Sequence, residues 1–84
     1  MPPPVGCRET IEYLKANRKS QTFEDLQKVL EDFGFVMHPG SGGSHRAFSR
    51  PGSFESPSLK QDRGPLLPAY VKSVIRALEE ICDD

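Results

Sequence analysis

Two amphipathic segments bracket a middle third of the chain that glycine and proline interrupt too often for a helix. Apolar residues recur at helical spacing over 23–33 and again over 68–82. Between them, short alternating runs end at Gly or Pro. Two apolar helix faces must share one core, and one layer of sheet is the smallest surface that accepts both. The pattern therefore predicts two helices on one face of a small sheet.

The helix over 23–33 carries the clearest end signals. Thr22 is a suitable N-cap, and Glu24 and Asp25 place negative charge in the first turn, where the helix dipole favours it. Gly34 is the expected left-handed stop, after which Phe35 can close back on the last turn.

The other elements follow from similar signals. A short helix is expected over about 8–16, and Pro68 is a good first residue for the last helix, 68–82. Strands are expected over 35–38, 44–50 and 55–61, the third being weakened by Pro57. The predicted fold class is α+β: a three-stranded antiparallel sheet with helices on one face, in the order α-β-β-β-α, plus a short N-terminal helix.

Alternation within 44–50 predicts how this strand is oriented. If Phe48 faces the helices, then Ser44, Arg46 and Arg50 share its face, while His45, Ala47 and Ser49 face the other way. The alternative makes Ala47 the core residue. We favour the first arrangement.

Length and charge limit the function. A chain of 84 residues allows one domain with a compact core, so any site should be shallow. Between Gly34 and Arg76, six basic residues stand against two acidic ones, which would attract a polyanion, although a solvated mixed surface explains the same balance.

The two cysteines and the chain start bear on location. Cys7 and Cys82 lie at opposite ends, and we expect a reduced intracellular pair, with a disulfide as the alternative. Met1 to Pro4 leads into polar sequence with no apolar run, so no membrane segment is expected and the predicted location is cytoplasmic.

A glycine turn, Gly42-Gly43, leads to one histidine at the start of the middle strand. Histidine gives and takes protons near neutral pH, its ordinary pKa being about 6.5, and arginine binds phosphate through a planar fork of donors. The combination indicates contact with a nucleic-acid backbone, and cleavage of that backbone by His45 is a hypothesis that it raises. The candidate phosphate contacts are Ser44, Arg46, Arg50, Lys60 and Arg63.

Three segments together resemble the HicA toxin family. They are Phe23 to Phe35; Gly43-Ser44-His45 with Phe48 and the Arg50-Pro51-Gly52 turn; and Gly64-Pro65-Leu66-Leu67-Pro68 with Val71, Val74-Ile75 and Leu78. They are similar to the family's first helix, its Gly-Ser-His strand and its final turn and helix. The chain departs from the family in its added arm, 1–21, in the loop 39–42, and at Arg46, where many members have a second histidine.

This resemblance implies a domain over 22–84 with a fold similar to a double-stranded RNA-binding domain. It also implies the toxin of a toxin–antitoxin pair, a metal-independent endoribonuclease that cleaves mRNA and is silenced by a HicB-like antitoxin. The family's catalytic histidine corresponds to His45. No cofactor, no metal and no DNA contact are expected.

Two other functions remain open. One is a non-catalytic RNA-binding module of the same fold, in which the basic residues matter and His45 does not. The other is a protein-interaction module, in which the apolar stripes of the last helix and the arm dock a partner. A second acid–base group is not visible in the sequence; His38, Lys60 or a bound water are the options.

Overall fold

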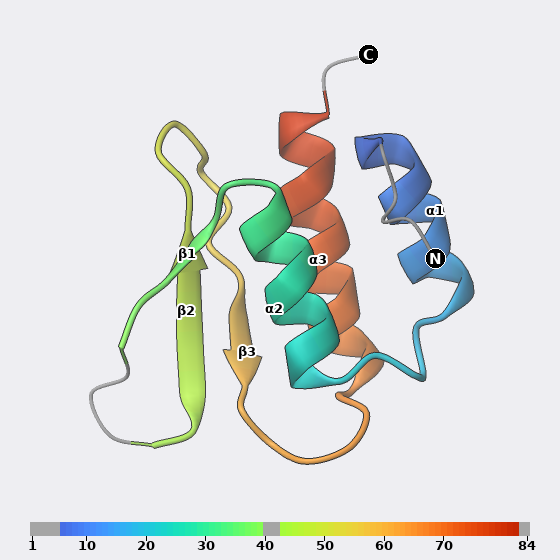
Figure 1. Cartoon of the computed structure of the whole chain (residues 1–84), viewed down its shortest axis with the longest axis vertical. Coiled ribbons are helices and arrows are strands. Elements are labelled where there is room, and N and C mark those ends of the chain that lie inside the picture. Colours follow the sequence, from blue (N-terminus) through green and yellow to red (C-terminus); the bar gives the residue numbers. More distant parts are fainter. Residues whose placement is uncertain (1–5, 40–42, 83–84) are drawn as a thin grey trace.

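The computed structural model describes residues 6–39 and 43–82, and Figure 1 shows three helices beside a small sheet. The helices are α1 (Cys7–Ala16), α2 (Phe23–Asp32) and α3 (Pro68–Ile81). The strands β1 (Val36–Met37), β2 (His45–Ser49) and β3 (Ser58–Lys60) form an antiparallel sheet in the order β1-β2-β3. The predicted α+β class and the order α-α-β-β-β-α are confirmed. Of the predicted hairpin loop, residues 40–42 lie outside the described part.

The predicted start of α2 and its glycine stop are confirmed, and the helix ends at Asp32, one residue before the predicted end. The hydroxyl of Thr22 accepts the N–H of Asp25 at 3.2 Å, and the Asp25 carboxylate accepts the N–H of Thr22 at 3.0 Å, which is a complete capping box. At the other end, Gly34 has a φ of 91°, which a residue with a Cβ rarely adopts. This turn lets the N–H of Phe35 donate to the Leu30 carbonyl at 2.9 Å.

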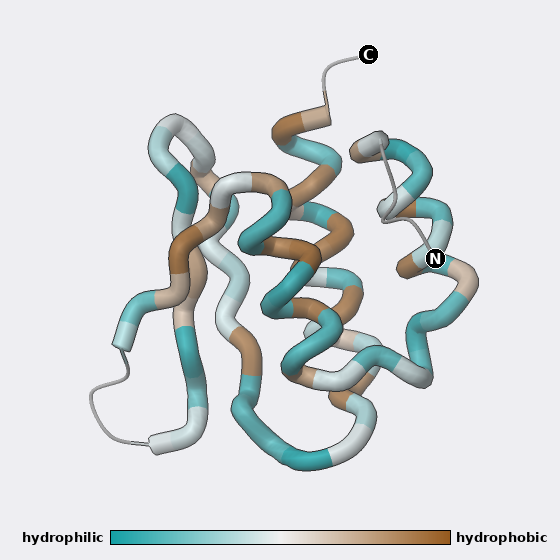
Figure 2. The backbone as a smooth tube through the Cα atoms, viewed as in Figure 1, coloured by the Kyte–Doolittle hydropathy of each residue, from teal (hydrophilic) through white to brown (hydrophobic). Residues whose placement is uncertain are grey.

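The core is a single cluster with contributions from every helix and from β2 and β3. Figure 2 shows hydrophobic residues recurring along α2 and α3 on successive turns. Val29, Phe33 and Ile81, which the helical stripes include, are only partly buried at its margin. The buried apolar residues are Ile11, Leu14, Phe23, Leu26, Leu30, Phe35, Phe48, Leu59, Leu66, Val71, Val74, Ile75, Ala77 and Leu78.

The favoured orientation of β2 is confirmed at Phe48 and Ala47. Phe48 is fully buried, and so is Leu59, which pairs with Arg46 across the sheet. Ala47 and its partner Ser58 are both exposed. Figure 1 shows α2 and α3 on the same side of the sheet, so the buried side chains of β2 and β3 face them. The third strand begins only at Ser58, because Pro57 has no N–H to donate to the ladder.

The expectation of a reduced cysteine pair is wrong for this structure, in which Cys7 and Cys82 form a disulfide. The reason is the antiparallel packing of α1 along α3 (Figure 1), which brings the first residue of α1 beside the last turn of α3. The two Cα atoms are 5.7 Å apart, within the range that a disulfide spans. Ile11 and Leu14 of α1 also belong to the common core, so the N-terminal segment packs against the rest of the domain.

Candidate functional site

His45 is the first residue of β2 and its side chain is exposed. In the sheet it pairs with Lys60, the last residue of β3. Its Nε2 atom lies 3.4 Å from the hydroxyl oxygen of Tyr70, which belongs to the first turn of α3. The two rings are tilted, with centroids 6.4 Å apart. The imidazole of His45 and the phenol of Tyr70 are therefore neighbours where β2 and α3 come together, and the backbone of Lys60 pairs with His45 at the same end of the sheet.

Backbone interactions hold these three elements in place. The N–H of Gln61 donates to the Ser44 carbonyl at 2.6 Å, which extends the β2–β3 ladder beyond His45. Gly43, with a φ of 87°, turns the chain immediately before it. On α3, the N–H of Tyr70 donates to the Leu67 carbonyl at 2.9 Å. His45 at the start of β2 and Tyr70 in the first turn of α3 are thus brought together.

The side chains of His45 and Tyr70 are suited to proton transfer. Imidazole and phenol can each donate or accept a hydrogen bond, and imidazole exchanges protons near neutral pH. The Lys60 ammonium lies 3.7 Å from the Asp62 carboxylate, an exposed pair of the kind that contributes little to stability. It can therefore turn to a phosphate at low cost.

Two further predicted residues lie close to His45. The guanidinium of Arg46 donates to the carbonyls of Gly43 and His45, both at 3.0 Å, so it folds back over the turn before the strand. Ser44 is half-buried, and its carbonyl is the acceptor for Gln61. Arg63 is exposed on the segment between β3 and α3.

Arg50 does not join this group. Its Nε donates to the Phe33 carbonyl at 3.0 Å and one terminal nitrogen lies 3.4 Å from the Ser53 hydroxyl. It therefore satisfies a carbonyl at the C-terminal end of α2. It follows the far end of β2, roughly 17 Å from His45 for an extended strand.

His38 follows β1 and is held by a different partner. Its N–H donates to the Ala47 carbonyl at 2.8 Å, and its Nε2 atom is hydrogen-bonded to the hydroxyl of Ser49. The main chain of His38 thus lies two residues from His45 along β2, but its ring is engaged with Ser49, whereas that of His45 is beside Tyr70. The two histidines therefore lie near each other along the sheet, but their rings are hydrogen-bonded to different partners.

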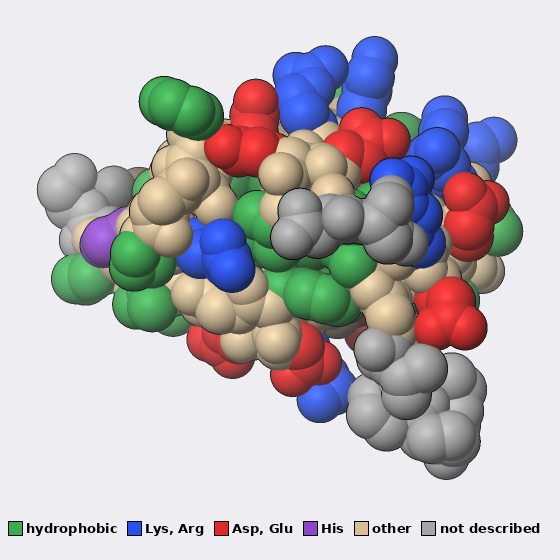
Figure 3. Space-filling model, turned by 90° about the horizontal axis from the view of Figure 1, so that it is seen from above, with side chains coloured by type: hydrophobic (Ala, Val, Ile, Leu, Met, Phe, Trp, Pro, Cys, Tyr) green, Lys and Arg blue, Asp and Glu red, His purple; other side chains and the backbone are tan. Residues whose placement is uncertain are grey.

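Sequence reasoning missed two features. One is Tyr70, which comes 25 residues after His45 and meets it only through the packing of α3 beside the sheet. The other is a group of cations on α1, α3 and the segment after α1. Figure 3 shows Lys and Arg side chains gathered on the side of the molecule that carries the helices. The charge count between Gly34 and Arg76 includes Lys72 and Arg76, but nothing in the sequence places Lys15 and Arg18 beside them.

Comparison with protein-family models, with curated proteins and with solved structures gives no match for this chain. Within residues 6–39 and 43–82, His, Cys, Asp and Glu side chains do not gather in any group of three or more that could hold a metal ion. In the same residues, each helix is too short or too polar to cross a membrane.

Proposed function

We propose that this chain is an endoribonuclease of the HicA type, the toxin of a toxin–antitoxin pair, with His45 as its catalytic residue. The observation that carries the proposal is the exposed imidazole of His45 beside the Tyr70 hydroxyl and across the sheet from Lys60. The α-β-β-β-α order after residue 22 agrees with the resemblance and adds support. The fold similar to a double-stranded RNA-binding domain is part of the same proposal.

The reaction uses the ribose of the substrate as its nucleophile. The imidazole of His45 accepts the proton of a 2′-hydroxyl, and the 2′-oxygen forms a bond to the adjacent phosphorus. The bond between phosphorus and the 5′-oxygen breaks, and that oxygen takes up a proton. The products are a 2′,3′-cyclic phosphate and a 5′-hydroxyl. No cofactor or metal enters these steps.

Two groups beside His45 are candidates to assist it in this reaction. The Tyr70 hydroxyl lies 3.4 Å from the imidazole and can supply or relay a proton. The Lys60 ammonium can stabilise the negative charge that grows on the phosphate oxygens. Arg46, beside the same turn, can add a second positive charge if it releases the carbonyls that it now contacts. An exposed site of this kind suits a flexible single strand.

The partners in this proposal are mRNA and a HicB-like antitoxin protein, and the location is the cytoplasm. Reducing conditions there keep cysteines as thiols, so the Cys7–Cys82 bond would form only on exposure to an oxidant.

The deciding experiment is cleavage of a labelled RNA by purified wild-type protein and the His45→Ala variant. We expect the variant to lose roughly 10²–10⁴-fold in rate, the usual contribution of a general acid–base group. Its thermal stability should be unchanged, because His45 is exposed. Wild-type cleavage should continue in chelator. The control is Lys28→Gln, which changes an exposed residue on α2 and goes through the same preparation; this variant should cut RNA at the wild-type rate. A folded His45→Ala protein that cuts at the wild-type rate would refute the proposal.

A second variant tests the neighbour of His45. Tyr70→Phe removes the hydroxyl and keeps the half-buried ring. If the hydroxyl takes part in proton transfer, cleavage should slow about tenfold or more, and the pH dependence of the rate should change. Unchanged cleavage would leave His45 to act with Lys60 or water.

A non-catalytic RNA-binding module is the second candidate. The observation that favours it is the group of cations on α1, α3 and the segment after α1, which is built from residues other than His45 and its neighbours. Tight RNA binding without cleavage, and without any effect of His45→Ala, would select this alternative.

A further inference from the structure

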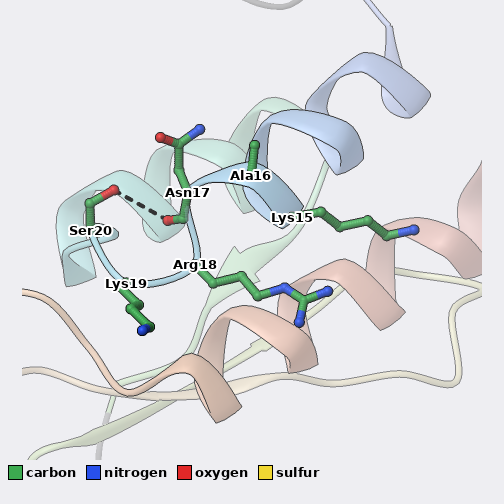
Figure 4. Close-up of a pocket in the computed structure, with 6 residues that line it drawn as sticks. All are labelled: Lys15, Ala16, Asn17, Arg18, Lys19 and Ser20. Carbon is green, nitrogen blue, oxygen red and sulfur yellow. Dashed lines mark hydrogen bonds between the residues drawn. The ribbon is translucent and has the colours of Figure 1, made fainter.

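A groove runs between the C-terminal half of α1, the segment that follows it, and α3. Its volume is about 330 Å³, and Ile75, only 6% exposed, forms part of its floor. A second hollow of about 350 Å³, lined by residues 15–20, shares Lys15 and Arg18 with it. Figure 4 shows these two side chains extending in one direction, away from Asn17 and Ser20. We call the first hollow the α1–α3 groove; it is lined by Lys15, Arg18, Lys72, Ile75, Arg76 and Glu79.

The charge of the α1–α3 groove is strongly positive. Four of its lining residues are cations, and Glu79 is the acid among them. Lys15 reaches Glu79 at 3.9 Å, but both side chains are about half exposed, so the pair is weak. In the described part of the chain, Arg18, Lys72 and Arg76 form no ion pair.

This arrangement places like charges close together. Lys72 and Arg76 are one turn apart on α3 and repel each other, as like charges at this spacing do. Arg18 comes from the segment after α1 and brings a third positive charge to the same groove. An anionic ligand would relieve this repulsion.

We infer that the α1–α3 groove binds the phosphate backbone of single-stranded RNA. The inference rests on the proposed function, for which it supplies a substrate-holding surface. An extended polyanion fits better than an acidic protein. The groove offers several charges along its length, while its apolar lining residue Ile75 is buried and gives a protein partner no anchor.

The position of the groove relative to His45 agrees with this role. Lys72 follows Tyr70 by two residues on α3, so the groove begins within one helical turn of the His45–Tyr70 pair. Residues two apart on a helix point to different sides of it. A strand that contacts both must therefore curve around the first turn of α3, which a flexible single strand can do and a rigid duplex cannot.

The test measures binding separately from cleavage. Every protein carries His45→Ala, so that the labelled single-stranded RNA stays intact. To this parent we add the triple change Arg18→Gln, Lys72→Gln and Arg76→Gln, and in a control only Lys28→Gln, a cation on α2 outside the groove. All proteins are checked for equal thermal stability, and the affinity is measured over a range of salt concentrations.

We expect the triple variant to bind at least about tenfold more weakly at low salt, and the control to bind as the parent does. Each phosphate contact to a single strand contributes about 0.7 to the slope of log affinity against log salt. The slope should therefore fall by about two. Equal affinity and slope in the triple variant and the parent would overturn the inference, as would a groove that binds an acidic polypeptide and not RNA. If the wild-type protein cuts no RNA, the proposed function fails, yet this comparison still decides whether the groove binds it.

Discussion

The carboxylate of Glu80 accepts the backbone N–H of Phe54 at 2.8 Å. The same carboxylate accepts the N–H of Glu55 at 2.9 Å. These two bonds tie the segment between β2 and β3 to the last turns of α3. They also hold Phe54 in place while its side chain is 96% exposed. One charged group thus fixes the end of the sheet that lies opposite His45.

This relationship predicts a dependence of stability on pH. The N–H groups of Phe54 and Glu55 lower the pKa of Glu80 below its ordinary value of 4.5; desolvation opposes them, and the charge of Arg50 adds a smaller lowering effect. A pKa that is lower in the folded state means that the contribution is complete above the unfolded pKa and is lost as the pH falls through the folded one. We expect Glu80→Gln to melt below wild type at neutral pH, with the difference shrinking under acid. Thermal melts across pH 2–7 measure it; a difference that stays constant would contradict the assignment.

The Cys7–Cys82 disulfide predicts a response to reductant. The bond joins residues separated by 75 positions, and closing a loop of this size stabilises a fold by about 4.5 kcal/mol in the chain-entropy description. Reduction, or the double change Cys7→Ser and Cys82→Ser, should lower the melting temperature by about 10 °C or more. Reductant should have no further effect on the double variant, which is the control. An unchanged wild-type melt in reductant would show that the bond is not formed.

The orientation of β2 predicts very different effects on the free energy of unfolding at two adjacent residues. Phe48 is fully buried, so Phe48→Ala should cost about 3–5 kcal/mol through lost burial and the cavity left behind. Ala47 is exposed, so Ala47→Ser should change the free energy of unfolding by no more than about 0.5 kcal/mol. Denaturant unfolding of both variants provides the comparison. Similar losses of unfolding free energy at the two positions would contradict this orientation of the strand.

Arg50 should act on stability and not on RNA. Its hydrogen bond to the Phe33 carbonyl stabilises the end of α2, and a bond from a charged donor contributes about 1.5–3 kcal/mol. Arg50→Gln should therefore lower the free energy of unfolding by about 1–2 kcal/mol, while Arg63→Gln, at an exposed position, should leave it unchanged. Chemical denaturation measures the first effect. If Arg50→Gln is fully stable but binds RNA poorly, the sequence-based role of Arg50 in phosphate binding is correct after all.

The elements that could be predicted from the sequence are those with local causes. The limits of α2 depend on Thr22, Asp25 and Gly34, which act within one or two turns of themselves. The burial of Phe48 and the exposure of Ala47 follow from the two-residue period of a strand. His45 could be singled out because its chemistry and its glycine turn are local as well. Arg46 follows it in the strand, and only the structure shows its guanidinium folding back to the carbonyls of Gly43 and His45.

Contacts between distant segments depended on the tertiary structure. The sequence determined that these helices and short strands form and in what order, although the third strand is only Ser58–Lys60 instead of 55–61. It did not determine which helix lies beside which strand end. That choice brings Tyr70 to His45, takes Arg50 away to Phe33, joins Cys7 to Cys82, and collects Lys15, Arg18, Lys72 and Arg76 in one groove. The physical reason is that periodicity and capping act over a few residues, whereas packing compares whole surfaces, and the best fit of three helices on one sheet is a property of all of them together.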